Sequence, residues 1–404
     1  MSGPDDAHAI IPPPAFLSDP APAAVLAALP GARVVGGPVR DALAGVRVHD
    51  VDVAAPLPPE EIARRLKAAG IKVFETGLKH GTVTAVLDHV PVEVTSLRRD
   101  VATDGRHAEV EWTTDWREDA ARRDFTINAM SLDAGGRLWD YFDGRGDLAA
   151  GIVRFVGDPA VRLREDYLRA LRFFRFQARF GRGEPDAAAL AAIRDAVPGL
   201  AARIAPERIW MELKRLLAGP NLVAALASMR ETGLLAAVLP EAGDLAVLAA
   251  LEAAGAPPDP LLRLAALLPP GSVPALASRL RLSGEERQRL QHFTLDFDST
   301  PPLSDKSPAR LRAWLAERSK DQAIGELWLA EARDGQDRTA LRAAVAAMER
   351  PVFPLQGRDL LPLGLPPGPG MGELLGALRA WWLAGGTAAD REECLEEARR
   401  RLGG

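Results

Sequence analysis

Two acidic residues, Asp50 and Asp52, are separated by a single apolar residue. Residues i and i+2 of a β-strand point to the same side. A strand over residues 49–54 would therefore put both carboxylates on one face and Val51 and Val53 on the other. Adjacent carboxylates repel each other unless a cation lies between them, and oxygen ligands suit Mg²⁺, which also binds substrate phosphates. Such a pair can hold two ions, one that would activate a 3′-hydroxyl and one that would stabilise a leaving pyrophosphate. Asp-x-Asp alone is also common on solvated strands and loops, which is the alternative interpretation.

A pair of glycines precedes these acids. Gly36 and Gly37 stand between a predicted strand, Arg33–Val35, and a predicted helix, Pro38–Ala44. Glycine lets the backbone approach an anion closely, and a helix N-terminus presents free N–H groups. Arg40, one turn into that helix, could reach a phosphate. A Gly-Gly pair alone is more often a structural turn, and this one lacks the lysine of a P-loop and the third glycine of a dinucleotide fingerprint.

A run of arginines lies on a third predicted element, a long helix over Arg162–Phe180. Four polar residues of this helix are spaced by three and share one face: Asp166, Arg169, Arg172 and Arg175. We expect the carboxylate of Asp166 to hold the Arg169 guanidinium in a fixed plane. A carboxylate beside a fixed guanidinium offers an acceptor and donors, which is enough to imitate a Watson–Crick edge. The alternative is an ordinary solvated basic face.

Composition is that of a water-soluble globular protein. The 404 residues suffice for about two to four domains, and the net charge is −5. A negative total does not exclude a nucleic-acid partner, because binding needs only a local positive patch, and arginines concentrate between Arg154 and Arg215. The single cysteine, Cys394, rules out an internal disulfide. With no signal-peptide pattern at the start and no apolar run that could cross a bilayer, we expect a cytoplasmic location and no membrane partner.

The order of predicted elements indicates an α+β protein. Prolines in residues 1–26 predict a flexible arm. Residues 27–150 mix predicted strands and helices, whereas residues 151–220 and 221–404 are rich in Ala and Leu and predict helices alone. Within the mixed region, the polar stretch 98–116 predicts a mobile loop.

These motifs together resemble a known family. Val35-Gly36-Gly37-x-Val39-Arg40-Asp41 followed by Asp50-x-Asp52 is similar to the first motif of class II tRNA nucleotidyltransferases and bacterial poly(A) polymerases, which belong to the DNA polymerase β-like superfamily. Three further matching segments follow in the family's order: Arg122–Ala129, Glu165–Phe176, and Pro206–Ile209 with Glu212 and Lys214. The resemblance implies a nucleotidyltransferase head at 27–150, a helical neck at 151–220, and a helical body and tail at 221–404.

The resemblance also implies roles for individual residues. Asp50 and Asp52 would bind two Mg²⁺ ions and carry the catalysis. Asp166 and Arg169 would select ATP or CTP without a nucleic-acid template, because GTP and UTP present mismatched groups. The other residues expected at the nucleotide are Gly36, Gly37, Arg40, Arg122, Arg123, Arg172 and Arg175.

For several residues, two interpretations remain open. Asp124 and Asn128 either support the nucleotide or organise the turn that contains them, and Glu93 is either a third acid or a surface strand residue. Glu207 and Arg208 are expected to support the neck. Gly368 and Gly370, at a predicted helix start, are candidates for receiving an RNA phosphate. The family's counterpart of the 98–116 loop helps to switch from C to A addition.

The implied substrates are tRNA, CTP and ATP, and the implied reaction is addition of C, C and A to the tRNA 3′ end. Gly357–Gly364 and Gly368–Gly372 resemble the tail of CCA-adding enzymes. Three alternatives remain at this point: a bacterial poly(A) polymerase, a partial enzyme that adds only CC or only A, and a non-catalytic RNA-binding module. No obligate protein partner is evident from the sequence.

Overall fold

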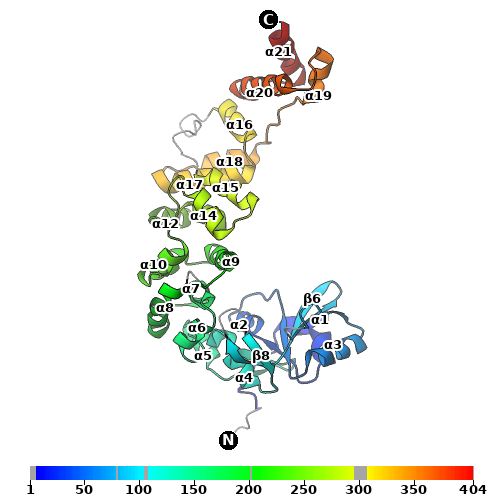
Figure 1. The fold of residues 1–404 in the computed structure, drawn as a ribbon, viewed down its shortest axis with the longest axis vertical. Helices are drawn as coiled ribbons and strands as arrows, with labels where there is room; N and C mark the ends of the chain where they lie inside the picture. Colours follow the sequence, from blue (N-terminus) through cyan, green and yellow to red (C-terminus); the bar gives the residue numbers. More distant parts are fainter. Residues whose placement is uncertain (1–5, 79–80, 104–107, 201–202, 295–306, 404) are drawn as a thin grey trace. The chain divides into compact units, whose positions relative to one another are not determined.

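The computed structural model describes residues 6–78, 81–103, 108–200, 203–294 and 307–403. The chain divides into two compact units, Met1–Pro240 and Glu241–Gly404 (Figure 1). Each unit is considered by itself below. All residues predicted to act at the nucleotide or the metal lie in the first unit, whereas Gly368 and Gly370 lie in the second.

The first unit contains an eight-stranded mixed sheet with the order β1-β10-β9-β2-β3-β6-β5-β4. The central pair, β3 and β6, is parallel, and the neighbouring pairs are antiparallel. Fully buried Val34, Val53 and Val94 occupy adjacent strands, as expected of β-branched residues in a sheet interior. The strands are β1 (Ala9–Ile10), β2 (Arg33–Val35), β3 (Asp52–Ala55), β4 (Lys72–Phe74), β5 (Thr82–Leu87), β6 (Val90–Ser96), β9 (Met130–Leu132) and β10 (Arg137–Asp140).

Two helices cover β5 and β6, namely α1 (Pro20–Ala28) and α3 (Pro59–Ala68) (Figure 1). Helix α3 begins with a proline and two acids in its first turn and is followed by Gly70 at φ 78°, a combination that favours both ends of a helix. Its buried Ile62 and Leu66 lie one turn apart, so they face the sheet together.

The predicted flexible arm over residues 1–26 is wrong for the described part of that segment. Strand β1 pairs with β10, a short 3₁₀ helix spans Ala15–Ser18, and α1 follows directly. Proline at the start of α1 is compatible with helix, and Val25 and Leu26 are buried against the rest of the unit. The prolines therefore mark element boundaries here, and residues 1–5 lie outside the described residues.

The predicted loop over residues 98–116 is also wrong, because most of it is a two-stranded antiparallel sheet. Strand β7 (Arg98–Thr103) pairs with β8 (Ala108–Trp112), and Arg99 forms a cross-strand ion pair of 2.7 Å with Glu111. Polar, exposed strands lack the apolar alternation by which strands are recognised in a sequence. Asp104, Gly105 and Arg106 lie outside the described residues.

The rest of the first unit is mainly helical. The helices are α2 (Gly37–Leu43), α4 (Trp116–Ala121), α5 (Gly144–Ala150), α6 (Pro159–Glu165), α7 (Leu168–Phe180), α8 (Ala187–Leu200), α9 (Pro206–Leu217), α10 (Leu222–Glu231) and α11 (Leu234–Val238), with a 3₁₀ turn at Thr126–Asn128. The predicted boundary after residue 220 does not match the division into units. Helices α10 and α11 pack against α7 and α8, which buries Leu226 and Leu234, so both belong to the first unit.

The predicted helix over Arg162–Phe180 is interrupted. Asp166 is extended, with φ −154° and ψ 106°, and it ends α6. Its Oδ1 accepts a hydrogen bond of 3.1 Å from the backbone N–H of Leu168, the first residue of α7. An aspartate that bonds its neighbouring backbone in this way starts a new helix rather than continuing the old one.

The described part of the second unit is helical. Its helices are α12 (Ala246–Ala253), α13 (Pro260–Ala265), α14 (Val273–Leu280), α15 (Gly284–Thr294), α16 (Pro308–Ala316), α17 (Lys320–Asp334), α18 (Thr339–Ala347), α19 (Gly357–Leu360), α20 (Pro369–Ala384) and α21 (Arg391–Gly403), with a 3₁₀ turn at Leu361–Leu363. In neither unit is any described helix both long enough and apolar enough to cross a membrane.

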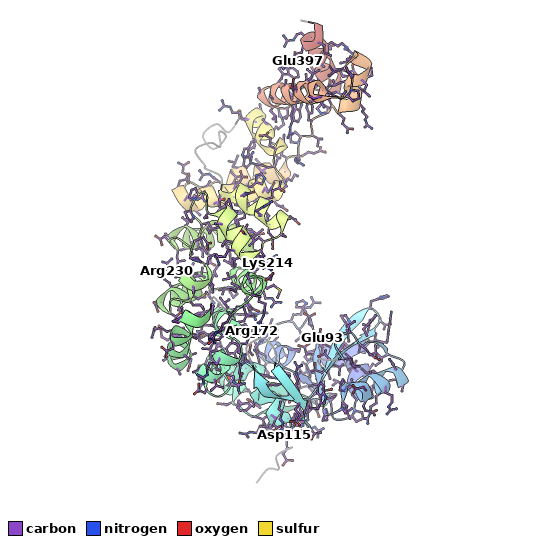
Figure 2. The ribbon with its side chains drawn as sticks, in the orientation of Figure 1. Glu93, Asp115, Arg172, Lys214, Arg230 and Glu397 are labelled. Carbon is purple, nitrogen blue, oxygen red and sulfur yellow. The ribbon has the colours of Figure 1, made fainter. Side chains whose placement is uncertain are left out.

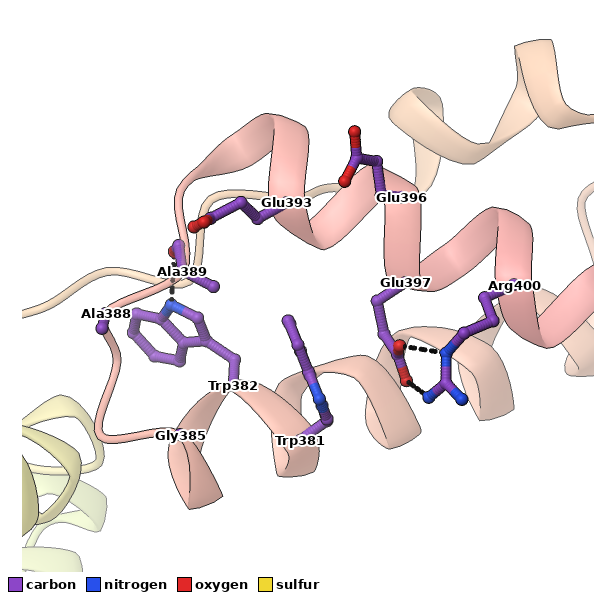
Figure 3. Close-up of a pocket in the computed structure, with 9 residues that line it drawn as sticks. All are labelled: Trp381, Trp382, Gly385, Ala388, Ala389, Glu393, Glu396, Glu397 and Arg400. Carbon is purple, nitrogen blue, oxygen red and sulfur yellow. Dashed lines mark hydrogen bonds and ion pairs between the residues drawn. The ribbon is translucent and has the colours of Figure 1, made fainter.

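Helices α20 and α21 pack around buried Leu378, Trp382 and Cys394. The Trp382 Nε1–H donates to the carbonyl of Ala389 at 3.0 Å, which fixes the turn between the helices (Figure 3). A cavity of about 530 Å³ lies beside this turn, and the Glu397 carboxylate that lines it is bound by Arg400 at 2.7 Å. The buried thiol of Cys394 is therefore part of the packing between α20 and α21.

Candidate active site

Three carboxylates meet at the start of the parallel strand pair. Asp52 is the first residue of β3, and the β3–β6 register places it opposite Glu93, which is labelled in Figure 2. Asp50 lies two residues before Asp52, outside the strand, so the strand starts later than predicted. Asp50 and Asp52 are both exposed while Val51 between them is buried, so the predicted alternation of faces is retained. The structure thus supports Glu93 as a neighbour of the acid pair.

The three acids create a negative potential at Asp52. Partial desolvation raises the pKa of the Asp52 carboxyl, and the nearby charges of Glu93 and Asp50 raise it further, against the opposing charge of Arg123. A carboxylate that is costly to ionise is stabilised by a cation. The donor set of carboxylate oxygens fits Mg²⁺ in kind. Among the described residues, however, no three acidic, His or Cys side chains are assembled as a complete metal centre.

Gly36 lies directly beneath one of the predicted nucleotide-binding arginines. Its φ of 74° and ψ of −122° are accessible mainly to glycine. A Cβ atom built there would lie 2.6 Å from Nη1 of Arg123. The glycine is therefore needed so that this guanidinium can lie against the backbone, next to the first turn of α2, which begins at Gly37.

Arg40 does not have the position expected of a phosphate ligand. Its guanidinium is buried and donates to Asp41 Oδ1 at 2.9 and 2.6 Å and to Asn128 Oδ1 at 2.5 Å. It also lies over the ring of Phe180, with 4.5 Å between Cζ and the ring centroid. Burial lowers the pKa of Arg40, although Asp41 opposes this effect. The side chain holds α2 in place, and its contact with a phosphate stays a prediction.

A buried carboxylate, Asp119, holds both predicted arginines of the second motif. It accepts from Arg122 at 3.0 Å and from Arg123 at 3.2 Å. Burial alone would raise the pKa of Asp119, but the charges of Arg123 and Arg122, with hydrogen bonds from Arg122 and from the backbone of Arg98, hold the pKa below its usual value. The two guanidiniums are therefore fixed in position before any substrate binds.

Arg169 is fixed too, but not by the residue that the sequence suggested. It forms an ion pair with Glu165 and donates to the backbone carbonyls of Arg162 at 3.0 Å and Arg122 at 3.3 Å. Asp166 binds Arg208 instead, at 2.7 Å. The prediction that Asp166 orients Arg169 is wrong because the chain leaves the helix at Asp166, which turns its carboxylate toward α9.

A short series of residues connects the neighbourhood of the acids to Arg169. Arg123 lies near enough to Asp52 for its charge to lower the pKa of that carboxyl. Arg123 and Arg122 both bind Asp119, and the carbonyl of Arg122 accepts a hydrogen bond from Arg169. The metal-binding and base-selecting groups predicted from distant parts of the sequence are thereby linked within one unit.

Arg172 and Asp124 are partners, which supports the interpretation that Asp124 organises the turn. The carboxylate accepts from Arg172 at 2.8 and 2.5 Å, from Asn128 Nδ2 at 2.9 Å and from the backbone N–H of Phe125 at 2.9 Å. Burial would raise the pKa of Asp124, but Arg172 and these hydrogen bonds hold it below its ordinary value. Since Asn128 also binds Arg40, Asp124 and Asn128 join α7 to α2 and organise the turn.

Arg175 is held by Glu212 of α9 at 2.7 Å, and the same carboxylate accepts from Arg215 at 3.0 Å. Figure 2 labels Arg172 on α7 and Lys214 on α9. Glu207 lies in the first turn of α9 beside Arg208, whose bond to Asp166 links α9 to the start of α7. The matching segment on α9 thus holds the segment Glu165–Phe176 in position.

The two tail glycines lie at the start of α20. Gly368 is its N-cap, in extended conformation, and Gly370 is in its first turn. A Cβ atom at either position would meet nothing within 4 Å. No steric demand within the chain explains these glycines, and RNA binding there stays a prediction.

Two residues of the site were missed by sequence reasoning, Asp119 and Glu165. Both stand one helical turn before the arginines that they bind: Asp119 precedes Arg122 and Arg123 by three and four residues, and Glu165 precedes Arg169 by four. That i,i+3 and i,i+4 spacing of opposite charges is the signal that would have identified them.

Comparison with known proteins places the chain in a family. Residues 32–154 match the model described as the Poly A polymerase head domain, and residues 184–245 match the probable RNA and SrmB-binding site of polymerase A. The chain is 40% identical over 375 residues to the mitochondrial CCA tRNA nucleotidyltransferase 1 of Danio rerio, covering 90% of this chain and 86% of that protein. It is 34% identical over 387 residues to the CCA-adding enzyme of Limosilactobacillus fermentum, covering 91% and 92%.

A solved structure agrees with these relatives. The CCA-adding enzyme of Bacillus stearothermophilus in complex with CTP superposes with a TM-score of 0.72 at 27% identity and covers 95% of this chain and 99% of that one. The fold and the acid cluster define a nucleotidyltransferase with a head of the poly(A) polymerase type. Within that class, the chain belongs to the family of CCA-adding tRNA nucleotidyltransferases.

Proposed function

We propose that this protein adds C, C and A to the 3′ end of tRNA from CTP and ATP, with Asp50, Asp52 and Glu93, where β3 begins to pair with β6, as its reaction centre. The observation that carries the proposal is the series of residues that joins this centre to Arg169: the charge of Arg123 acts on Asp52, Asp119 binds both Arg123 and Arg122, and the carbonyl of Arg122 accepts from Arg169. A reaction centre and a group able to read a base are thereby held in one rigid arrangement, as template-independent transfer requires.

Asp50 and Asp52 are the proposed ligands of divalent metal, with Glu93 as a supporting acid. Two Mg²⁺ ions bound there would supply activation of the 3′-hydroxyl and charge stabilisation at the departing pyrophosphate. The protein's own contribution is to place these acids close together, and the raised pKa of Asp52 reflects the cost of ionising its carboxyl there without a cation.

Arg122 and Arg123 are the proposed contacts to the triphosphate or ribose of the incoming nucleotide. Their guanidiniums remain partly exposed, at 19% and 20% of the side chain, although Asp119 holds one edge of each. A guanidinium has five N–H donors in a planar fork, so donors remain for an oxygen ligand.

Asp166 and Arg169 are the proposed readers of the base. Arg169 is fixed by Glu165 and by two carbonyls, while Asp166 is 29% exposed and bound to Arg208. A correct base would satisfy both groups, whereas GTP or UTP would leave buried polar atoms unpaired. Arg172 and Arg175 support this pair by fixing α7 against Asp124 and Glu212.

The test is a substrate assay with tRNA that lacks its 3′ CCA. We expect a single CCA end when CTP and ATP are both present and two added C residues with CTP alone. Asp50→Asn and Asp52→Asn should each abolish addition while tRNA binding persists. Open-ended A tails with ATP alone would instead favour a poly(A) polymerase, the alternative suggested by the head-domain match. Arrest after CC, or addition of A only, would identify a partial enzyme.

A cytoplasmic location is part of the proposal. Relatives of similar length carry the name mitochondrial, so the compartment is tested by fractionation of the source cells with an antibody to this chain. Recovery with organelles would overturn it.

A further inference from the structure

A cavity of about 610 Å³ lies in the first unit, bounded by the ends of α2, α5 and α7. Three arginines line it, Arg145, Arg179 and Arg182, together with apolar groups that include Val46 and Phe180. No acidic residue occurs in its described lining. Its size is that of pockets that hold small ligands or fragments of larger ones.

The charge state of this cavity differs from that of the candidate active site. Arg122, Arg169 and Arg175 are each neutralised by a carboxylate. Within the part of the chain that the structure describes, none of the three cavity arginines forms an ion pair with a carboxylate. Arg179 also contributes to the lowered pKa of the nearby Arg40, so the positive potential extends into the protein. The cavity therefore carries a concentrated positive charge in a chain whose net charge is −5.

Helix dipoles account for only part of this arrangement. Arg182 donates to the carbonyls of Leu148 and Ala149 at the end of α5, at long distances of 3.4 and 3.3 Å, and Arg179 is in the last turn of α7. Positive charge is favourable at both places. Arg145, however, is the second residue of α5, where the dipole favours negative charge. Its position is not explained by the helix that carries it.

We propose that this cavity binds phosphate, and specifically a phosphodiester of the RNA substrate. The inference rests on the proposed function for the identity of the RNA, but the charge and shape of the cavity stand without it. Guanidiniums in a planar fork match phosphate oxygens, and several unpaired arginines around one cavity form a phosphate site. Val46 of the cavity lining lies on the segment that joins α2 to β3, four residues before Asp50, so the cavity and the acid pair are connected by a short stretch of chain.

Free pyrophosphate, the product of the proposed reaction, carries the same chemical groups and is the second source to be tested. Whichever of the two ligands binds in the cavity, removing cavity arginines should weaken its binding. If the ligand is RNA, the affinity for tRNA falls; if the ligand is pyrophosphate, the affinity for pyrophosphate falls.

The experiment uses the full chain with Arg145→Gln, Arg179→Gln and the double variant. Arg64→Gln is the matched control, because Arg64 is an exposed arginine of α3 outside both the cavity lining and residues 184–245, and its loss changes the net charge equally. Binding of tRNA lacking its 3′ CCA is measured against salt concentration, and pyrophosphate binding is measured by calorimetry. Circular dichroism melting verifies that each variant is folded.

We expect each cavity variant to weaken tRNA binding several-fold and to reduce the slope of log affinity against log salt by roughly one, with a larger effect in the double variant. Arg64→Gln should change neither. Weaker pyrophosphate binding with unchanged tRNA binding would identify pyrophosphate as the ligand of the phosphate site. If the double variant matches Arg64→Gln in both measurements, the proposal is overturned. Neither measurement requires catalysis, so a failure of CCA addition in the wild type is seen separately.

Discussion

Asp52 and Glu93 lie opposite each other in the parallel pairing of β3 with β6, although 41 residues separate them in the chain. Their proximity is a property of the crossover that brings β6 alongside β3. Partial burial raises the pKa of the Asp52 carboxyl, and the charges of Glu93 and Asp50 raise it further against that of Arg123. A cation bound at Asp52 would relieve this cost of ionisation.

The first prediction concerns the pKa of Asp52. In protein free of divalent metal, Glu93→Gln removes one of the charges that raise this pKa, so the pKa should fall. Because the folded-state pKa of Asp52 is above its ordinary value, its protonated form contributes stability below the ordinary value, and this is lost as pH rises through the folded-state pKa. NMR titration of the labelled carboxyl groups measures the shift, with Glu60→Gln on α3 as the control. An unchanged Asp52 titration in Glu93→Gln would show that the two charges do not interact.

The second prediction concerns Asp124, whose pKa is held below its ordinary value by Arg172 and hydrogen bonds. The ionised carboxylate therefore contributes stability above its ordinary pKa, and the contribution is lost as pH falls through the lower folded-state pKa. Asp124→Asn breaks a buried pair and should cost about 3–5 kcal/mol in free energy of unfolding at pH 7. Urea unfolding measured from pH 7 to pH 3 should show that the difference from wild type shrinks toward acid. A difference independent of pH would contradict an ionised Asp124.

The sheet could be predicted where its residues are β-branched and half buried. The bounds of β5 and β6 follow from their sequences because Val and Thr alternate there between buried and partly exposed positions. The pairing of β7 with β8 could not be predicted, because the sequences of these strands are mostly polar and lack an apolar alternation. An alternation of apolar and polar residues reflects which side chains of a strand are buried. Strands with few buried side chains therefore lack the pattern by which a strand is recognised in a sequence.

The sequence predicts which residues belong to the site, but not which of them bind each other. Asp50, Asp52 and Arg169 follow from the motifs, yet the carboxylate that holds Arg169 was misidentified. Glu165 and Asp166 are adjacent in sequence and both are within one turn of Arg169, so the choice depends on where α6 ends. Arg40 illustrates the same limit, since burial by Phe176 and Phe180 is a tertiary event that local spacing does not encode.

The third prediction tests the contact between Gly36 and Arg123. Gly36→Ala forces both an unfavourable φ of 74° and a Cβ within 2.6 Å of the guanidinium, so we expect a loss of stability of about 1–3 kcal/mol and a raised KM for CTP. Gly45→Ala is the matched control, because it has φ 69° but nothing within 4 Å of its Cβ. The control should lose stability from backbone strain while KM stays unchanged. Equal KM values for the two variants would remove the argument that Gly36 serves Arg123.

The fourth prediction separates the two acids at the break between α6 and α7. Glu165→Gln removes the charge that pairs with Arg169 but retains the size of the side chain, so Arg169 should lose its fixed orientation. As a positioning residue, Glu165 should affect the discrimination between CTP and UTP more than the maximal rate with CTP. Asp166→Asn, in contrast, changes a proposed contact to the base and should lower kcat/KM for CTP itself by about 10–100-fold, the scale of losing one or two hydrogen bonds to charged groups.

Arg208→Gln tests the other proposed reader, since it frees Asp166 from its partner without touching Arg169. Steady-state kinetics with each of the four nucleotides on tRNA lacking its 3′ CCA would measure all three variants. Because Arg169 is held by Glu165 and Asp166 by Arg208, Glu165→Gln and Arg208→Gln should each accept UTP measurably better relative to CTP. If Arg208→Gln relaxes discrimination while Glu165→Gln leaves it intact, the orientation of Asp166 rather than that of Arg169 governs the choice of base. That result would contradict the role assigned to Glu165.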